Sequence, residues 1–168
     1  MIYRTRTYIA ADWTGDKDAV NQLTTWNEGK KWGLSFGDAH ELSSCRSDDT
    51  NNCNIKKNCS QNLDHSKYFV LIVGDKTKDT RAGYCMYCKA YNTCSYTYKT
   101  NKSFIEFECK YAVNNNLPII VLYNSNKVDK SKCIDSVVNV AKAHVAMKDN
   151  YNNWDYLSVK AAFDMLGK

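Results

Sequence analysis

The chain has 168 residues, of which 43% are hydrophobic and 24% are charged, and its formal net charge is +5. This length fits one domain with a sizeable core, and the composition is typical of a folded globular protein. Lysine and arginine are scattered along the chain without forming a block, so we expect no nucleic acid as a partner.

The longest apolar runs are too short for a membrane span. They lie at 68–73 and 117–123, whereas a membrane helix needs roughly 20 apolar residues, so we expect no membrane partner. The first residues lead directly into a strand-like run without an apolar signal segment. We therefore expect a cytoplasmic protein in which the eight cysteines are mostly reduced.

The first half of the chain alternates strand-like and helix-like segments. We expect, in chain order, a strand at 5–11, a helix containing Ala19, Val20, Leu23 and Trp26, a short strand at 34–36, a polar surface loop at 41–54, a helix at 55–63 and a strand at 68–73. Either Thr14 or Asp16 is a suitable cap for the first helix. The uninterrupted apolar run at 68–73 is typical of a strand buried on both faces.

The second half begins with a cysteine- and tyrosine-rich segment around 76–101 that follows no clear pattern. After it we expect a helix at 103–112, a strand at 117–123, a helix at 133–140, a strand at 143–147 and a helix at 154–166. The last helix carries Trp154, Leu157, Ala161 and Met165 on one face. We therefore expect this helix to pack against the sheet.

This alternation predicts a single α/β domain over residues 1–168, with a mostly parallel sheet and helices on both faces. In such sheets, ligands bind at the carboxyl ends of the strands, near the point where the strand order reverses. Asp12, Asp38, Asp75 and Asn124 all stand at predicted strand ends. We therefore expect a ligand site on that edge.

Two glutamates of the helix at 103–112 have different expected surroundings. Glu106 and Lys110 lie on its polar side in the order that favours a solvated ion pair. Glu108 falls near the middle of a broad apolar arc, where an unpaired carboxylate costs several kcal/mol or titrates with a shifted pKa. Together with Phe104, one turn earlier, Glu108 has the features needed to hold a nicotinamide ribose and stabilise an oxocarbenium-like centre. A buried glutamate satisfied by lysine or backbone donors is an equal alternative.

A thiolate metal site is a weaker hypothesis. Cys85 and Cys88 have the spacing of half a zinc site, and Cys94 follows six residues later. A fourth ligand would come from Cys45, Cys53, Cys59 or His40, none of which completes a second motif of the same spacing. A redox pair and ordinary thiols remain the alternatives.

The acidic residues at strand ends also permit a phosphoacceptor site like that of receiver domains. Asp75 would accept phosphate, with Asp12 on a metal ion and with Ser125 and Lys148 after later strands. This hypothesis gives Glu108 no task. Helix caps or turn residues are the plainer interpretation of these acids.

The opening strand at 6–12, the strand at 68–74 and above all the helix at 104–112 resemble TIR-like domains, in particular the TIR proteins of bacterial Thoeris antiphage systems. Those domains carry a Trp-x-x-x-Glu-x-x-x-Ala pattern on a helix after the third or fourth strand. Here Phe104 stands for the Trp, Glu108 for the Glu and Ala112 for the Ala. The chain departs from the pattern at this Phe, at Ala10 and Ala11 of the first strand, and in the insertion around 76–101.

The resemblance implies a single flavodoxin-like domain that cleaves the nicotinamide–ribose bond of NAD⁺ and makes an ADP-ribose-derived signal for a partner effector. It implies Glu108 as the catalytic residue and Phe104, Asp12, Trp13 and Asp38 as substrate-binding residues. NAD⁺ would be a substrate, with no bound cofactor required. Self-association with other TIR domains is also implied, and a non-enzymatic TIR interaction module is the alternative.

Overall fold

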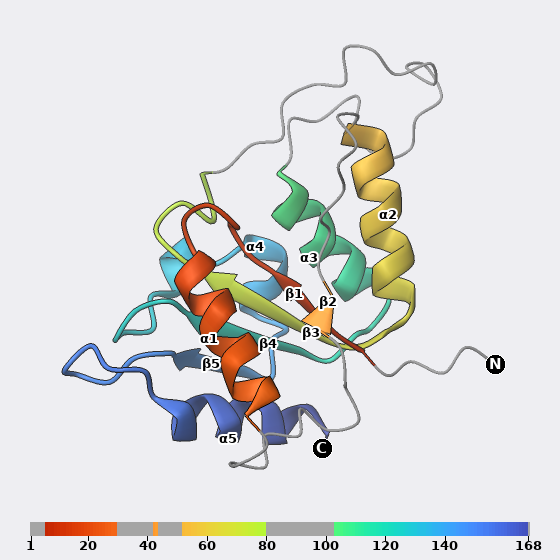
Figure 1. Cartoon of the computed structure of the whole chain (residues 1–168). Helices are drawn as coiled ribbons and strands as arrows, with labels where there is room; N and C mark the ends of the chain where they lie inside the picture. Colours follow the sequence, from red (N-terminus) through yellow and green to blue (C-terminus); the bar gives the residue numbers. More distant parts are fainter. Residues whose placement is uncertain (1–5, 30–41, 44–51, 80–102, 168) are drawn as a thin grey trace.

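The computed structural model describes residues 6–29, 42–43, 52–79 and 103–167. Within them, one parallel sheet has the order β2-β1-β3-β4-β5, as Figure 1 shows. Its strands are β1 (Arg6–Ala10), β2 (Leu42–Ser43), β3 (Ser66–Val73), β4 (Ile119–Tyr123) and β5 (Ala143–Ala146). The order reverses between β1 and β3, which places the ligand-binding switch point at the carboxyl ends of these two strands. The predicted flavodoxin-like α/β fold is confirmed.

Helices cover both faces of this sheet (Figure 1). They are α1 (Lys17–Glu28), α2 (Asn52–Asp64), α3 (Phe104–Asn114), α4 (Asp135–Val138) and α5 (Tyr156–Leu166), together with the 3₁₀ turn η2 (Lys130–Lys132). The helices α1 and α5 pack on one face, and α2, α3 and α4 pack on the other. None of the helices in the described ranges is long and apolar enough to cross a membrane.

The strand β3 contributes to a core on each side of the sheet. Val70 and Ile72 lie in the core under α1 and α5, whereas Phe69 and Leu71 lie in the core under α3 and α4. Successive side chains of a strand point to opposite faces, so a strand covered on both faces must be apolar throughout. The predicted burial of the run at 68–73 on both faces is therefore confirmed, and the structure places its strand at the centre of the sheet.

The start of α3 is fixed by a capping box. The backbone N–H of Glu106 donates to Ser103 Oγ, and the backbone N–H of Ser103 donates to Glu106 Oε2, both at 3.0 Å. These bonds satisfy two backbone donors that the first helical turn leaves free. The carboxylate of Glu106 thus serves the helix start, whereas the sequence suggested an ion pair with Lys110.

One prediction about local structure was wrong, and another was right only in part. The strand β2 lies inside the segment 41–54 that was expected to be a polar loop, and it pairs with β1 through its backbone, for which no apolar pattern is needed. On α5, Leu157 is 75% exposed and Met165 is 45% exposed, whereas Val159 and Phe163 are buried. The helix packs on the sheet, as expected, but Leu157 and Met165 of the stripe named from the sequence face outward, whereas Trp154 packs against the core. The expected strand at 34–36 lies outside the described residues.

The described cysteines differ in their oxidation state. Cys109 and Cys133 are buried free thiols, and Cys59 is disulfide-bonded. The prediction was that the cysteines are mostly reduced, so Cys109 and Cys133 agree with it and Cys59 is an exception.

Candidate active site

Glu108 lies in the second turn of α3, and its carboxyl group faces β1. The residue is only 5% exposed, and the Tyr8 hydroxyl donates a hydrogen bond to Glu108 Oε1 at 2.7 Å. Tyr8 is fully buried, and its ring stacks on Phe69 with centroids 5.8 Å apart and planes 7° apart. Glu108 is therefore buried among aromatic rings, as predicted. The hydrogen-bond partner of its carboxyl group is the neutral hydroxyl of Tyr8 and not a lysine.

Burial dominates the protonation of this carboxyl group. Removal from water raises the pKa of Glu108 to about 8, and the hydrogen bond from Tyr8 acts in the opposite direction by favouring the ionised form. The carboxyl group is therefore mostly protonated at neutral pH in the protein without substrate. A positive charge placed beside it would favour ionisation, because opposite charges lower the pKa of an acid.

The first turn of α3 also carries two aromatic rings that contact a buried cation. Lys56 of α2 is 1% exposed, and its Nζ lies 5.7 Å from the ring centroid of Phe104 and 5.6 Å from that of Phe107. These distances suit cation–π attraction, which is strengthened when the cation is removed from water. Lys56 thus joins α2 to the turn that precedes Glu108. Its expected helix was only weakly amphipathic, so its pattern gave no signal for this burial.

A second polar cluster lies where the ends of β3 and β4 approach the start of α1. Asn124 Nδ2 donates to Asp16 Oδ1 at 3.0 Å and to Asp18 Oδ1 at 2.8 Å. Asp16 is 3% exposed, and burial raises its pKa to about 6, whereas the bond from Asn124 lowers it and the neighbouring acids raise it further. This cluster ties the start of α1 to the end of β4 at the carboxyl edge of the sheet.

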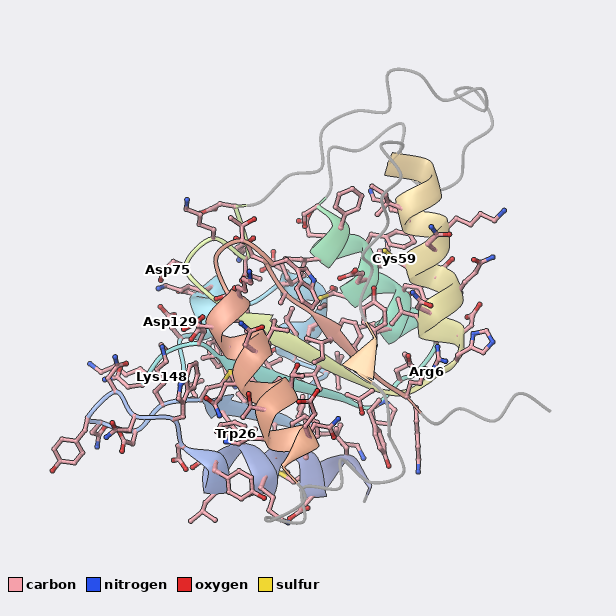
Figure 2. All side chains as sticks on the ribbon, viewed as in Figure 1. Arg6, Trp26, Cys59, Asp75, Asp129 and Lys148 are labelled. Atoms are coloured by element: carbon pink, nitrogen blue, oxygen red, sulfur yellow. The ribbon has the colours of Figure 1, made fainter. Side chains whose placement is uncertain are left out.

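The acids proposed for a phosphoacceptor site are engaged in ion pairs or turns. Figure 2 shows Asp75, Asp129 and Lys148 along the carboxyl edge of the sheet, with Arg6 near its opposite end. Asp75 pairs with Lys132 at 2.7 Å while its side chain is 90% exposed, and Lys148 lies 3.5 Å from Asp18. The described ranges contain no group of three histidine, cysteine or acidic side chains able to hold a metal ion. Cys85, Cys88 and Cys94 lie outside these ranges, so zinc stays a prediction.

Glu108 is not among the lining residues of three clefts that lie wholly within the described part of the chain. A cleft of about 660 Å³ lies between the loops after β3 and β4, with Gly74, Asn124 and Lys127 among its lining residues. A cleft of about 510 Å³ lies beside the outer side of α3, and one of about 300 Å³ lies at the amino end of β4. The first occupies the edge at which parallel sheets bind ligands.

The predicted substrate-binding residues do not all gather around Glu108. Phe104 lies one turn before it on α3. Asp12 is half-buried after β1 and accepts a hydrogen bond from the backbone N–H of Thr14 at 3.1 Å. Trp13 packs against the core under α1 and α5, whereas Glu108 lies on the opposite face of the sheet, against Tyr8. Asp38 lies outside the described residues.

Sequence reasoning missed Tyr8 as the partner of Glu108, because the two are 100 residues apart. A general signal was present, since a buried tyrosine hydroxyl usually finds a hydrogen-bond partner. The pattern of β1 placed Tyr8 in a strand, but nothing in the sequence specified which helix would face it.

The family model described as Thoeris protein ThsB, TIR-like domain, matches residues 8–82. The chain is therefore similar to the ThsB TIR-like domain. The expected resemblance to Thoeris TIR proteins is confirmed over this segment, which is under half of the chain and runs from β1 past the end of β3. The ThsB match ends before α3, so it does not include Glu108.

Among solved structures, the chain is similar to a 3-dehydroquinate dehydratase-like protein from Bifidobacterium longum, at 16% identity and a TM-score of 0.42, over 96% of this chain and 93% of that one. This likeness supports no conclusion about function. A comparison with curated proteins finds no match.

Proposed function

We propose that this chain is a TIR-type NAD⁺ nucleosidase or ADP-ribosyl cyclase that makes an ADP-ribose-derived signal in antiphage defence. The observation that carries the proposal is the position of Glu108, a carboxyl group held among aromatic rings on the helix that bears the TIR-like pattern. The ThsB match of residues 8–82 supports the family context from an independent part of the chain.

The proposed reaction breaks the bond between the ribose C1′ and the nicotinamide nitrogen. The bonding electron pair leaves with nicotinamide, which departs as a neutral molecule, and positive charge develops on the ribosyl centre. Ionised Glu108 stabilises this charge electrostatically, as acids do in glycosyl transfer. Water then adds to C1′ and loses a proton, giving ADP-ribose. When a ribose or base of the same molecule adds instead, the product is cyclic.

The raised pKa of Glu108 links its charge to the substrate. The nicotinamide ring of NAD⁺ is cationic, so its arrival beside the carboxyl group favours the ionised form and expels a proton. At pH 6 this deprotonation opposes binding, and at pH 8 the carboxyl group is already about half ionised. Nicotinamide release should therefore increase between pH 6 and pH 8.

Access to Glu108 is the structural condition of this proposal. The residue is 5% exposed and Oε1 is bonded to Tyr8, so ribose reaches the carboxyl group after the start of α3 shifts or the side chain changes rotamer. A change of this kind offers a natural point for control by an activator.

The direct test is nicotinamide release from NAD⁺ by the purified chain and by Glu108→Gln, with and without a phage-derived activator. Glutamine keeps an oxygen that accepts from Tyr8 but cannot become an anion. Glu106→Gln is the matched control, since glutamine also closes a capping box and the helix is otherwise unchanged. We expect at least a hundredfold loss in Glu108→Gln and parental activity in Glu106→Gln, a range typical of losing one charge-stabilising group. Equal release by both variants would remove the proposal.

A non-enzymatic TIR interaction module is the second candidate, and the same contact favours it. The bond from Tyr8 gives Glu108 a partner inside the core, which is sufficient for a purely structural role. Absence of nicotinamide release from the parent and from Glu108→Gln under all activating conditions would support this candidate.

Two further parts of the proposal concern partners. The nucleotide product would act on a separate effector, and activity would depend on self-association with other TIR domains. Mass spectrometry of the reaction products identifies the nucleotide, and activity measured against protein concentration reports on assembly. A specific activity that is constant over a wide concentration range would contradict the role of self-association.

A further inference from the structure

Tyr8 occupies a rigid position in the sheet. Its strand β1 is paired on both sides, with Tyr8 beside Ser43 of β2 and beside Phe69 of β3. The stacked ring of Phe69 fixes the plane of the Tyr8 ring in addition to the backbone. The position of the Tyr8 hydroxyl group is therefore fixed, because functional groups are held most accurately when they are carried by rigid elements.

The hydroxyl of Tyr8 meets the carboxyl group of Glu108 in a dry environment. Both residues are buried, at 0% and 5% exposure, and the 2.7 Å distance is that of a good O–H···O bond. The rotamer of a carboxyl group that is bonded in this way is defined, because turning Oε1 away would leave the phenol hydroxyl without this partner inside the core.

We propose that Tyr8 is the positioning residue of the proposed NAD⁺-cleaving site, and that its hydroxyl orients the Glu108 carboxyl group and stabilises its anion. This inference rests on the proposed function. Tyr8 is not proposed to touch the substrate. It donates to Oε1 and leaves Oε2 as the oxygen that turns toward the ribosyl centre when the site opens.

Of the titratable groups around α3, only Tyr8 acts on the pKa of Glu108, and burial is the other cause. The neighbouring titratable side chains are Arg6 and Tyr8 on β1, Lys56, Lys57 and Asp64 on α2, Asp135 on α4, and Glu106, Cys109, Lys110 and Tyr111 on α3 itself. Removal of the Tyr8 hydroxyl therefore has a defined effect on the ionisation of the acid.

The test uses Tyr8→Phe, which keeps the ring and its stack on Phe69. The proteins are labelled with ¹³C at the glutamate carboxyl carbons, and the Glu108 resonance is assigned by its loss in Glu108→Gln. This resonance is then titrated in the parent and in Tyr8→Phe. We expect the midpoint of Glu108 to rise by about one pH unit in Tyr8→Phe, because the donor that favours the anion is gone. The midpoint of nicotinamide release against pH should rise by the same amount. Activity should accordingly fall about tenfold at pH 7 and recover at higher pH.

Tyr111→Phe is the matched control. The hydroxyl of Tyr111 donates to Asp64 Oδ1 at 2.8 Å, so this variant also removes a tyrosine–carboxylate bond, from the same helix, without touching Glu108. Thermal unfolding shows that each variant is folded. In Tyr111→Phe, neither the Glu108 titration nor the pH profile of nicotinamide release should move.

The outcomes separate this inference from the proposed function. Parental activity in Glu108→Gln overturns the proposed function, and with it the catalytic meaning of Tyr8. Loss of activity in Glu108→Gln together with an unchanged titration and pH profile in Tyr8→Phe overturns the role of Tyr8 alone. A similar fall of activity at every pH, with the Glu108 midpoint unmoved, also overturns it, because it shows general damage and no effect on the acid.

Discussion

The carboxylate of Asp16 occupies the space that a Cβ atom on Gly74 would need. Gly74 follows β3 and Asp16 precedes α1, so the close approach lies at the switch point of the sheet, between the chain ends of β1 and β3. The side chain of Asp16 is also held by Asn124, so it has little freedom to yield. The absence of a side chain at position 74 is what allows the acid to be buried there.

This packing predicts that Gly74→Ala destabilises the protein by about 2 kcal/mol, the usual cost of overfilling a packed site. Asp16→Ala should relieve the clash, so the double variant should be more stable than the sum of the two single effects. Gly15→Ala is the control, because its Cβ would lie 2.8 Å from Oδ2 of the partly exposed Asp12, which can move aside. Denaturant unfolding measures all four variants. Additive effects of Gly74→Ala and Asp16→Ala would contradict the clash.

The protonation of Glu108 predicts an unusual pH dependence of stability. Its pKa is about 8 in the folded protein and 4.5 as a free side chain, so between these values the folded state keeps a proton that the unfolded state has lost. The contribution of Glu108 to stability therefore falls as the pH rises through this window. Glutamine does not titrate, and the stability of Glu108→Gln relative to the parent should rise by up to about 4 kcal/mol from pH 4.5 to pH 8.

Urea unfolding at several pH values measures this difference. Asp16 also titrates with a raised pKa, but it is present in both proteins and cancels. A constant difference between Glu108→Gln and the parent over this pH range would mean that the carboxyl group of Glu108 is ionised in the fold despite its burial.

The two rings that contact Lys56 allow a paired test of whether Phe104 contacts the nicotinamide ring of NAD⁺. Phe104→Leu and Phe107→Leu each remove one ring at nearly the same distance from the ammonium group, so their costs in stability should be similar. Phe104 stands one turn before Glu108 at the TIR-like pattern position, and its loss should raise the KM for NAD⁺ about threefold to tenfold, as expected for one aromatic contact. Steady-state kinetics at pH 8 measures the KM for NAD⁺ in both variants. An equal rise in KM for Phe107→Leu would show that the contact with Lys56, and not stacking on nicotinamide, is responsible.

The sequence predicted those features that depend on local pattern. The double-sided burial of β3 followed from its apolar run, and the burial of Glu108 followed from helical periodicity. The contact between Tyr8 and Glu108 depends on how β1 and α3 meet in space, which periodicity within either element does not specify. The same limit applies to Lys56, whose burial depends on rings from another helix.

The outward face of α5 shows how a helical pattern can mislead. Leu157, Ala161 and Met165 lie four residues apart and form one stripe, and Val159, Ala162, Phe163 and Leu166 form another. Both stripes are apolar, so hydrophobicity alone did not decide between them. The second stripe packs in the core, whereas Leu157 and Met165 of the first are exposed.

The capping box of α3 offers the last test, because it joins stability to the site. Ser103→Ala removes the side-chain bond to the backbone N–H of Glu106 at the start of α3, and Asp155→Ala removes two bonds from Ser158 at the start of α5. Each loss of a helix cap should reduce the free energy of unfolding by about 1 kcal/mol. Only Ser103→Ala loosens the turn that carries Phe104 and leads into Glu108.

We therefore expect kcat/KM for NAD⁺ to fall in Ser103→Ala and to stay at the parental value in Asp155→Ala, although both are destabilised alike. In the proposed function, a shift of the start of α3 is one of the two routes by which ribose reaches Glu108, so looser capping would have two opposing consequences. It aids entry, but it weakens the alignment of the carboxyl group, and misplacement by about 1 Å can cost a hundredfold in rate. Alignment should dominate, so the loss should appear in kcat. A rise in kcat for Ser103→Ala would instead show that opening of this turn limits the reaction.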